Sequence, residues 1–149
     1  MSVRSAGSVL VAERTARNIV LRQGAAVIAA LFTGATGATP VNTIQVGFAK
    51  EAATPDLAAL TPPTDPSIQP GALRSPVAAS DFKIIADQPD SVQVLVTGVF
   101  KPTVELADVT EAGLLAGDKL YNQVVFEPVT LKPGQDVTFF WEIDFPFGR

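Results

Sequence analysis

Cysteine and histidine are both absent from this chain of 149 residues. Without cysteine, the chain can form no disulfide and has no thiolate to act as a nucleophile or a metal ligand. Without histidine, it has no imidazole for a zinc site, a proton shuttle or a catalytic triad. The fold must therefore be stabilised by packing, and carboxylates are the side chains left for metal binding or acid–base chemistry.

Aromatic side chains with a polar tip are scarce, because the chain has one Trp and one Tyr. Few platforms are left for stacking sugars, which disfavours a carbohydrate- or ligand-binding sandwich. The acidic residues show no calcium-loop spacing, and Glu142 and Asp144 are expected on a solvated strand face. For an enzyme, Glu111 and Glu142 form the one pair worth testing for glycoside hydrolysis. We expect no catalytic residue, no metal and no cofactor.

Long apolar runs are also missing. The longest, residues 25–32, is far short of the ~18 to 20 residues that cross a bilayer. The first seven residues, MSVRSAG, lack the apolar centre and the cleavage site of a secretory signal. We expect no membrane partner, and a protein that is made and folded in a cytoplasm.

The chain is rich in apolar residues for its length. Hydrophobic residues make up 47% of the sequence and charged residues 17%, within a length that suits one domain. Such a composition indicates that apolar area is also buried against neighbouring subunits, which predicts a homo-oligomer. The alternative is simply an alanine-rich chain, since alanine raises the hydrophobic count without making adhesive surface.

Charge divides the chain into a basic head and an acidic body. Residues 1–23 carry four arginines against Glu13, a net charge of +3, so the rest must carry −7 to give the total of −4. We interpret residues 1–23 as an N-terminal arm, in which residues 8–11 and 19–21 are either edge strands or extended segments. The acidic remainder argues against nucleic acid, so a protein neighbour is the expected partner. The candidate contact residues of the arm are Arg4, Arg14, Arg17 and Arg22.

Period-two alternation predicts most of the remaining structure. From Val137 to Phe145 the apolar residues fall on every second position, which predicts a strand with one dry face. Residues 120–126 predict a strand before it, and the turn at residues 132–135 makes the two strands adjacent and antiparallel. Further strands are predicted at 43–48, 81–86 and 92–100, and a short buried helix at 25–32.

These elements predict a mainly β fold, an antiparallel β-sandwich or jelly-roll-like domain over residues 24–149, with one short helix and the extended N-terminal arm. Residues 51–79 hold six of the 12 prolines. Proline removes a backbone donor and fixes φ, so this stretch is predicted to be a long loop. We expect the loop to pack onto a neighbouring subunit through Leu57, Leu60, Ile68 and Leu73.

The phrases TEAGL at 110–114 and LYNQVVF at 120–126 are the most specific of several that occur in an order resembling a group of tailed-bacteriophage virion proteins. The chain differs from the group's pattern at Phe48, Leu115 and Gln123. The other phrases are NIVLRQG at 18–24 followed by AAVIAALFTG, IQVGF at 44–48 and WEI at 141–143.

The resemblance implies a structural role in a virion and supplies no catalytic residue. Members of the group occur as small standalone particle proteins and as attachment domains of tail fibres or baseplates. We therefore expect a capsid decoration or cement protein that stabilises the shell as an oligomer, with the major capsid protein or tail proteins as partners. The alternative is a tail collar, baseplate or fibre-attachment protein. The motif residues also have ordinary structural explanations, in which Glu111 bridges a turn, Gly113 lets the chain bend, and Leu114, Tyr121 and Phe126 fill the core.

Overall fold

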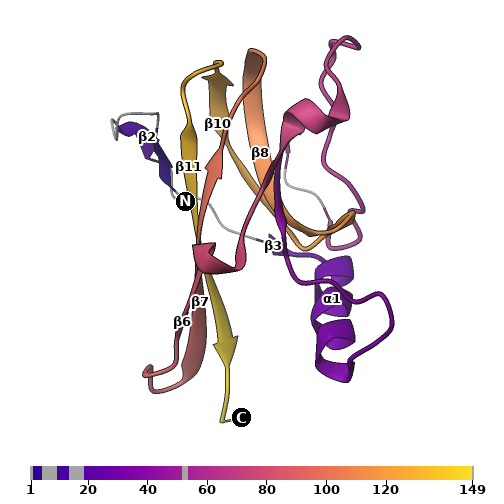
Figure 1. The fold of residues 1–149 in the computed structure, drawn as a ribbon, viewed down its shortest axis with the longest axis vertical. Helices are drawn as coiled ribbons and strands as arrows, with labels where there is room; N and C mark the ends of the chain where they lie inside the picture. Colours follow the sequence, from indigo (N-terminus) through magenta and orange to yellow (C-terminus); the bar gives the residue numbers. More distant parts are fainter. Residues whose placement is uncertain (1, 5–9, 14–18, 52–53, 149) are drawn as a thin grey trace.

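A computed structural model describes residues 2–4, 10–13, 19–51 and 54–148. Within these ranges the chain forms two antiparallel sheets that share one main core, with a helix, α1 (Arg22–Thr33), beside them (Figure 1). This arrangement confirms the mainly β sandwich that the alternation predicts.

The first sheet has the strand order β2-β1-β11-β7-β6, and the second has the order β3-β10-β8-β4-β5, with β9 paired to β8. The strands of the first sheet are β1 (Ser2–Arg4), β2 (Leu10–Glu13), β6 (Phe82–Ile85), β7 (Ser91–Phe100) and β11 (Val137–Pro146). Those of the second are β3 (Ile19–Val20), β4 (Thr43–Gly47), β5 (Arg74–Pro76), β8 (Leu106–Ala116), β9 (Lys119–Leu120) and β10 (Asn122–Leu131).

Strand β11 has the predicted dry face over its first half. Val137, Phe139 and Trp141 are buried, and the rings of Phe139 and Trp141 stack with centroids 5.6 Å apart. Phe126 of β10 approaches Phe139 from the second sheet at 6.5 Å. Aromatic pairs at these separations stabilise a core beyond the area they bury. The main core therefore lies between β11 and the facing strands of the second sheet.

The predicted pairing of residues 120–126 with residues 137–145 is wrong. Strand β10 pairs with β8 and β3, whereas β11 pairs with β7 and β1. The turn at residues 132–135 thus carries the chain from one sheet to the other. Alternation specifies which face of a strand is buried, but it does not specify which strand lies beside it.

Strand β8 is the longest of the strands that the sequence patterns missed. From Glu111 to Ala116 every residue is buried, so this part of the strand is covered on both faces and shows no alternation. Asp108 interrupts the strand with a φ of 58°, near a shift in the register between β8 and β10. Because β8 holds the TEAGL phrase, it places that phrase at the centre of the second sheet.

Helix α1 is longer and more exposed than predicted. It begins at Arg22 and ends at Thr33, where Gly34 adopts a left-handed φ of 65°. Only one face of the helix touches the sheets: Gly24 and Val27 are buried, whereas Phe32 is 92% exposed. The prediction of a buried helix is therefore wrong, because the apolar residues of this run lie on more than one face.

The predicted arm and loop both contribute regular structure. The described parts of residues 1–23 form β1 and β2 in the first sheet and β3 in the second, and the boundary at residue 23 falls inside α1. The predicted loop runs without helix or strand through residues 54–69. It then forms a 3₁₀ turn at Pro70–Leu73, strand β5 and, at its end, a second 3₁₀ turn at Ala79–Asp81.

Candidate functional site

The TEAGL phrase places a carboxylate in the interior of the protein. Glu111 of β8 is fully buried, and both of its carboxylate oxygens accept hydrogen bonds. Oε2 accepts from the N–H of Ala49 at 3.0 Å and of Thr61 at 2.7 Å, and Oε1 accepts from Nε2 of Gln123 at 2.8 Å. A buried carboxylate is costly unless it is bonded in this way. Glu111 of β8 thus holds three segments together: β10, the chain just after β4, and residues 51–79, which we call the Pro-rich loop.

Three glycines in the same phrases of the sequence have no room for a side chain, and one of them, Gly47, lies beside this carboxylate. A Cβ on Gly47 would lie 2.5 Å from Oε2 of Glu111, and a Cβ on Gly113 would collide with the backbone of β10. A Cβ on Gly24 would overlap the backbone oxygen of Tyr121. Each glycine permits two segments to approach more closely than any other residue would allow.

Asn122 of the LYNQVVF phrase bonds to the TEAGL strand. Its Oδ1 accepts a hydrogen bond from the N–H of Leu114 at 2.8 Å, and the N–H of Tyr121 donates to the carbonyl of Leu114 at 2.8 Å. The N–H of Leu21 in turn donates to the carbonyl of Tyr121 at 3.1 Å. Four phrases of the resemblance therefore meet in one packed group. We call it the motif cluster, and its members are Gly24, Gly47, Glu111, Gly113, Asn122 and Gln123.

The structure does not bring the candidate carboxylate pair into one site. Glu111 is buried in the second sheet beneath the Pro-rich loop, whereas Glu142 is exposed on the outer face of the first sheet. Oε1 of Glu142 accepts a hydrogen bond from Nε2 of Gln93 at 2.8 Å. Since the two side chains lie on opposite faces of the sandwich, they cannot flank one scissile bond.

The anchors of the Pro-rich loop pack onto the chain itself. Leu60 and Leu73 are each only 5% exposed, and Leu57 and Ile68 are partly buried. Leu73 and Ile68 join the main core, while Leu57 and Leu60 cover the other face of β8. Within the chain, Leu57 and Leu60 thus cover the outer face of the second sheet and Leu73 and Ile68 fill the main core, while a contact of these residues with a neighbouring subunit stays a prediction. The small cluster on that face consists of Leu21, Leu60, Leu115 and Leu120.

The arginines of the predicted arm fall into two groups. Nε of Arg22 donates to Oδ1 of Asp56 at 2.6 Å, so this arginine pairs with the chain's own loop, although both side chains are exposed. The side chains of Arg4, Arg14 and Arg17 lie outside the described residues. Of these four arginines, Arg22 is thus the one whose side chain is described, and its contact lies within the chain.

An apolar cleft of about 460 Å³ opens between α1 and the first sheet. Its walls include Ile28 of α1, Phe82 of β6, Val94 of β7, and Ile143 and Phe145 of β11. No charged side chain lines it among the residues that the structure describes. Cavities of this size with mostly apolar walls are typical of binding sites.

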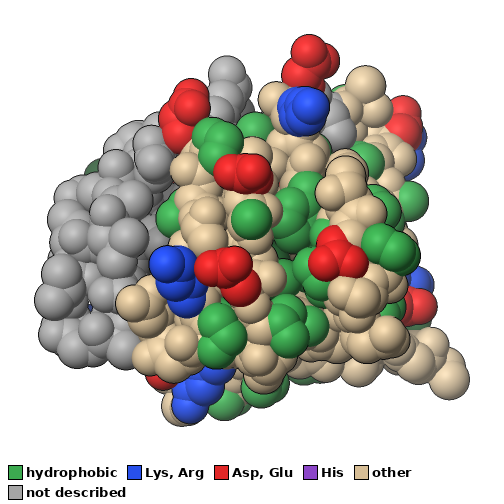
Figure 2. All heavy atoms as spheres, turned by 90° about the horizontal axis from the view of Figure 1, so that it is seen from above, with side chains coloured by type: hydrophobic (Ala, Val, Ile, Leu, Met, Phe, Trp, Pro, Cys, Tyr) green, Lys and Arg blue, Asp and Glu red, His purple; other side chains and the backbone are tan. Residues whose placement is uncertain are grey.

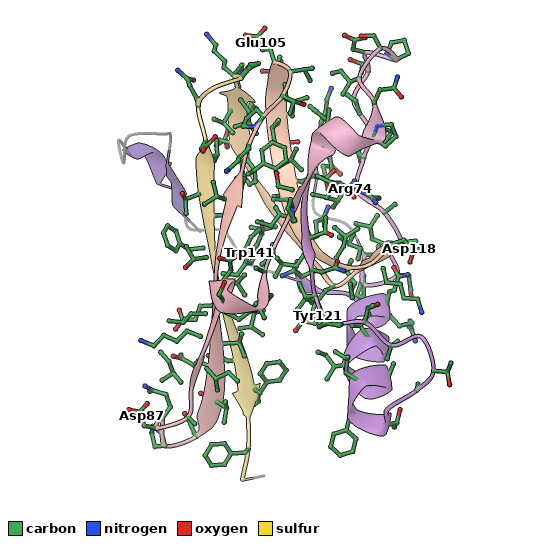
Figure 3. All side chains as sticks on the ribbon, in the orientation of Figure 1. Arg74, Asp87, Glu105, Asp118, Tyr121 and Trp141 are labelled. Carbon is green, nitrogen blue, oxygen red and sulfur yellow. The ribbon has the colours of Figure 1, made fainter. Side chains whose placement is uncertain are left out.

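Two polar side chains border the cleft. Oδ1 of Asn42 accepts hydrogen bonds from the N–H of Gly117 at 3.1 Å and from Oγ1 of Thr43 at 2.9 Å, so this amide oxygen serves the loops. Tyr121 lies between the first sheet and α1 (Figure 3). Burial raises the pKa of its hydroxyl above the ordinary value of 10.0, because a phenolate there would lose its water. The cleft therefore suits an uncharged, apolar group.

Apolar surface continues beyond the cleft. Phe32 lies one turn beyond Ile28 on the same face of α1, and Ile84 lies two residues beyond Phe82 on the same face of β6. Phe32 is 92% exposed, Ile84 70% and Phe147 51%. In Figure 1 the lower ends of β6, β7 and β11 extend past the strands of the second sheet, and α1 lies across from them. We call this surface, with the cleft, the open end.

The opposite end of the molecule is different in character. Figure 2 looks onto that end, where acidic and basic side chains are scattered among the apolar ones.

The open end was not predicted, although one sequence signal pointed to it. The alternation of β11 continues through Ile143 and Phe145, beyond the part that the second sheet covers. A strand whose apolar face is longer than its partner sheet must leave part of that face for something else.

Within the described ranges, no cluster of three or more acidic side chains could hold a metal ion, and no helix is long and apolar enough to span a membrane. Comparison of the chain with protein-family models, with curated proteins and with solved structures finds no match.

Proposed function

We propose that this chain is a structural protein of a tailed-bacteriophage particle, a capsid decoration or cement protein that binds the shell as an oligomer. The observation that carries the proposal is the open end, which combines an uncharged cleft with the exposed side chains of Phe32, Ile84 and Phe147. Large exposed apolar patches on soluble proteins commonly mark the surfaces that partners cover. A protein whose task is to bind subunits of a particle needs such a surface.

The motif cluster supports the phage setting. The phrases that resemble phage virion proteins supply its buried glycines, its carboxylate and its two amide side chains. These residues hold segments of the chain together. Phrases of this kind suit a shared structural framework, as a virion role requires.

A tail collar, baseplate or fibre-attachment protein could use the same open end. The two positions differ in copy number, because a shell offers hundreds of equivalent sites and a tail offers few. Gel densitometry of purified virions of a phage that encodes the chain measures this directly. Hundreds of copies per particle place the protein on the shell, and a handful places it on the tail.

Removal of the gene tests the shell role itself. We expect particles without the protein to lose a layer of surface density in electron micrographs and to release their DNA at a lower temperature. Adding the purified protein back restores both properties. Particles with an unchanged surface and unchanged thermal stability would contradict the proposal.

A further inference from the structure

Two free strand edges lie on either side of β7 in the first sheet. Among the residues that the structure describes, β6 pairs with β7 alone. Strand β11 has β1 as a second neighbour only at Thr138 and Phe139, so residues 140–146 pair with β7 alone in that same set. Unpaired edges of this kind readily accept a strand from another subunit.

The two free edges stand at the same level of the sheet. Leu95 of β7 is opposite Lys83 on one side and opposite Glu142 on the other. Residues that face each other across neighbouring strands point to the same side of a sheet. The side chains of Lys83 and Glu142 therefore share the outer face, at one height, with a single strand between them.

The same match holds on the inner face. Val94 of β7 is opposite both Ile84 and Ile143. Ile84 is largely exposed and Ile143 is half-buried, so both edges carry apolar surface inward. Each edge thus presents an apolar inner face, and the outer face carries Lys83 with Ile85 on β6 and Glu142 with Asp144 on β11.

The charges of the two edges are complementary. Lys83 is exposed on β6, and Glu142 and Asp144 are exposed on β11. The ion pair found within the described part of the chain joins Arg22 and Asp56, so these three charges have no ionic partner there. Pairing β11 with a second β11 would gather four carboxylates, and pairing β6 with a second β6 would bring two lysines together. Pairing β6 with β11 places opposite charges side by side.

We infer that a second copy of this chain adds its β6 to the free edge of β11, and that repetition of this contact closes a ring. Both strands are antiparallel to β7, so a rotation about an axis along the strands leaves them parallel to each other. A closed ring allows no rise along its axis. The shared level of Lys83 and Glu142 meets that condition, because rotation alone brings Lys83 of one copy beside Glu142 of the next. The inference deepens the proposed function and rests on its premise that the protein acts as an oligomer.

Cysteine pairs test the contact, because the native chain has none. In the variant Lys83→Cys/Glu142→Cys, the introduced thiols of one chain lie two strand spacings apart, roughly 9 to 10 Å. A disulfide needs Cα atoms within about 7 Å, so only a neighbouring copy can complete the bond. Mild oxidation with oxidised glutathione is expected to give a ladder of covalent oligomers. The matched variant Lys83→Cys/Glu105→Cys, with Glu105 at the far end of the molecule (Figure 3), is expected to stay monomeric on the denaturing gel.

Charge exchange tests the same contact without cysteine. In sedimentation of the purified chain, Lys83→Glu and Glu142→Lys should each weaken association by roughly fivefold or more, because each sets like charges side by side. The combined variant Lys83→Glu/Glu142→Lys should regain the association of the native chain. The control Glu105→Lys/Lys132→Glu changes exposed charges away from both edges and should leave association unchanged.

A native chain that sediments as a monomer at every concentration, with no ladder from the first cysteine pair, would overturn the inference. Such a monomer could still bind particles, in which case the proposed function stands and only the ring fails. Conversely, a ring that binds no particle would uphold the inference and remove the proposed function.

Discussion

The carboxylate of Glu111 fills the space that a side chain at position 47 would need. A Cβ on Gly47 would lie 2.5 Å from Oε2 and 2.8 Å from Cγ of Glu111. The same Oε2 accepts hydrogen bonds from the N–H groups of Ala49 and Thr61. These residues belong to the segments that lead away from β4 and cover the second sheet. One glycine and one carboxylate, 64 positions apart in the sequence, thus attach the Pro-rich loop to the sandwich.

Gly47→Ala is expected to destabilise the protein by about 2 to 4 kcal/mol, since the new methyl group displaces a buried, hydrogen-bonded carboxylate. Chemical denaturation measures the loss. The matched control is Gly71→Ala, where a Cβ would meet nothing within 4 Å and the backbone has no left-handed φ. This control should stay within about 1 kcal/mol of the native chain. Equal stability of the two variants would contradict the proposed role of Gly47.

Leu60 and Arg22 both attach the Pro-rich loop, but with very different strength. Leu60→Ala should cost about 2 to 4 kcal/mol, because it removes a side chain that is only 5% exposed. Arg22→Ala should cost less than about 1 kcal/mol, because its ion pair with Asp56 is exposed and screened by water. Thermal denaturation ranks the two variants. A larger loss for Arg22→Ala would show that the loop is held by charge.

The pKa of Tyr121, the single tyrosine of the chain, measures the burial of its hydroxyl. Because burial raises the pKa of Tyr121, the unfolded chain loses its phenolic proton first, and the free energy of unfolding falls as the pH rises above 10.0. Absorbance titration of the phenolate should give a pKa above 10.0 in the native protein and about 10 in denaturant. Tyr121→Phe should remove this part of the alkaline destabilisation. A native pKa at or below 10.0 would contradict the burial of the hydroxyl.

Exposed phenylalanines at the open end should matter for binding and not for folding. Phe32→Asp changes a side chain that is 92% exposed, so the free energy of unfolding should stay within about 0.5 kcal/mol of the native value. Binding to particles that lack the protein should weaken at least tenfold, because the proposed contact buries this ring. Cosedimentation with the particles measures binding of Phe32→Asp and of the control Val104→Asp. Val104 is also an exposed apolar residue, but it lies away from the open end. Equal binding by Phe32→Asp and Val104→Asp would remove the open end from the interface.

The sequence patterns predicted the positions of strands that have one solvent-exposed face. Strands β6, β7 and β11 lie close to their predicted bounds. The second half of β7 and the first half of β11 alternate between exposed and buried residues, whereas β6 does not. Strand β8 escaped prediction because both of its faces are covered and Asp108 breaks its register. The pairing of β10 with β8 was also out of reach, since alternation carries no information about neighbours.

The motif cluster and the open end depend on contacts between distant parts of the sequence. The donors to Glu111 come from residues 49, 61 and 123, so nothing near Glu111 in the sequence signals that it is buried. The sequence indicates Leu57 and Leu60 as anchors, but their packing on the outer face of the second sheet is a tertiary property. Likewise, the exposure of Phe145 follows from how far the second sheet extends, which no local pattern encodes.

Strand β11 lies between β7 and β1, and it pairs Phe139 with Val3 from near the start of the chain. Contacts between residues so far apart must wait until the late segment has left the ribosome, and they make folding slow. Until β11 is in place, Phe100 and the inner face of β7 lack a neighbouring strand on one side. The nascent protein therefore exposes this apolar surface to the cell. We expect synthesis to be the stage at which this protein depends most on chaperones, and at which lowering the temperature improves its yield most.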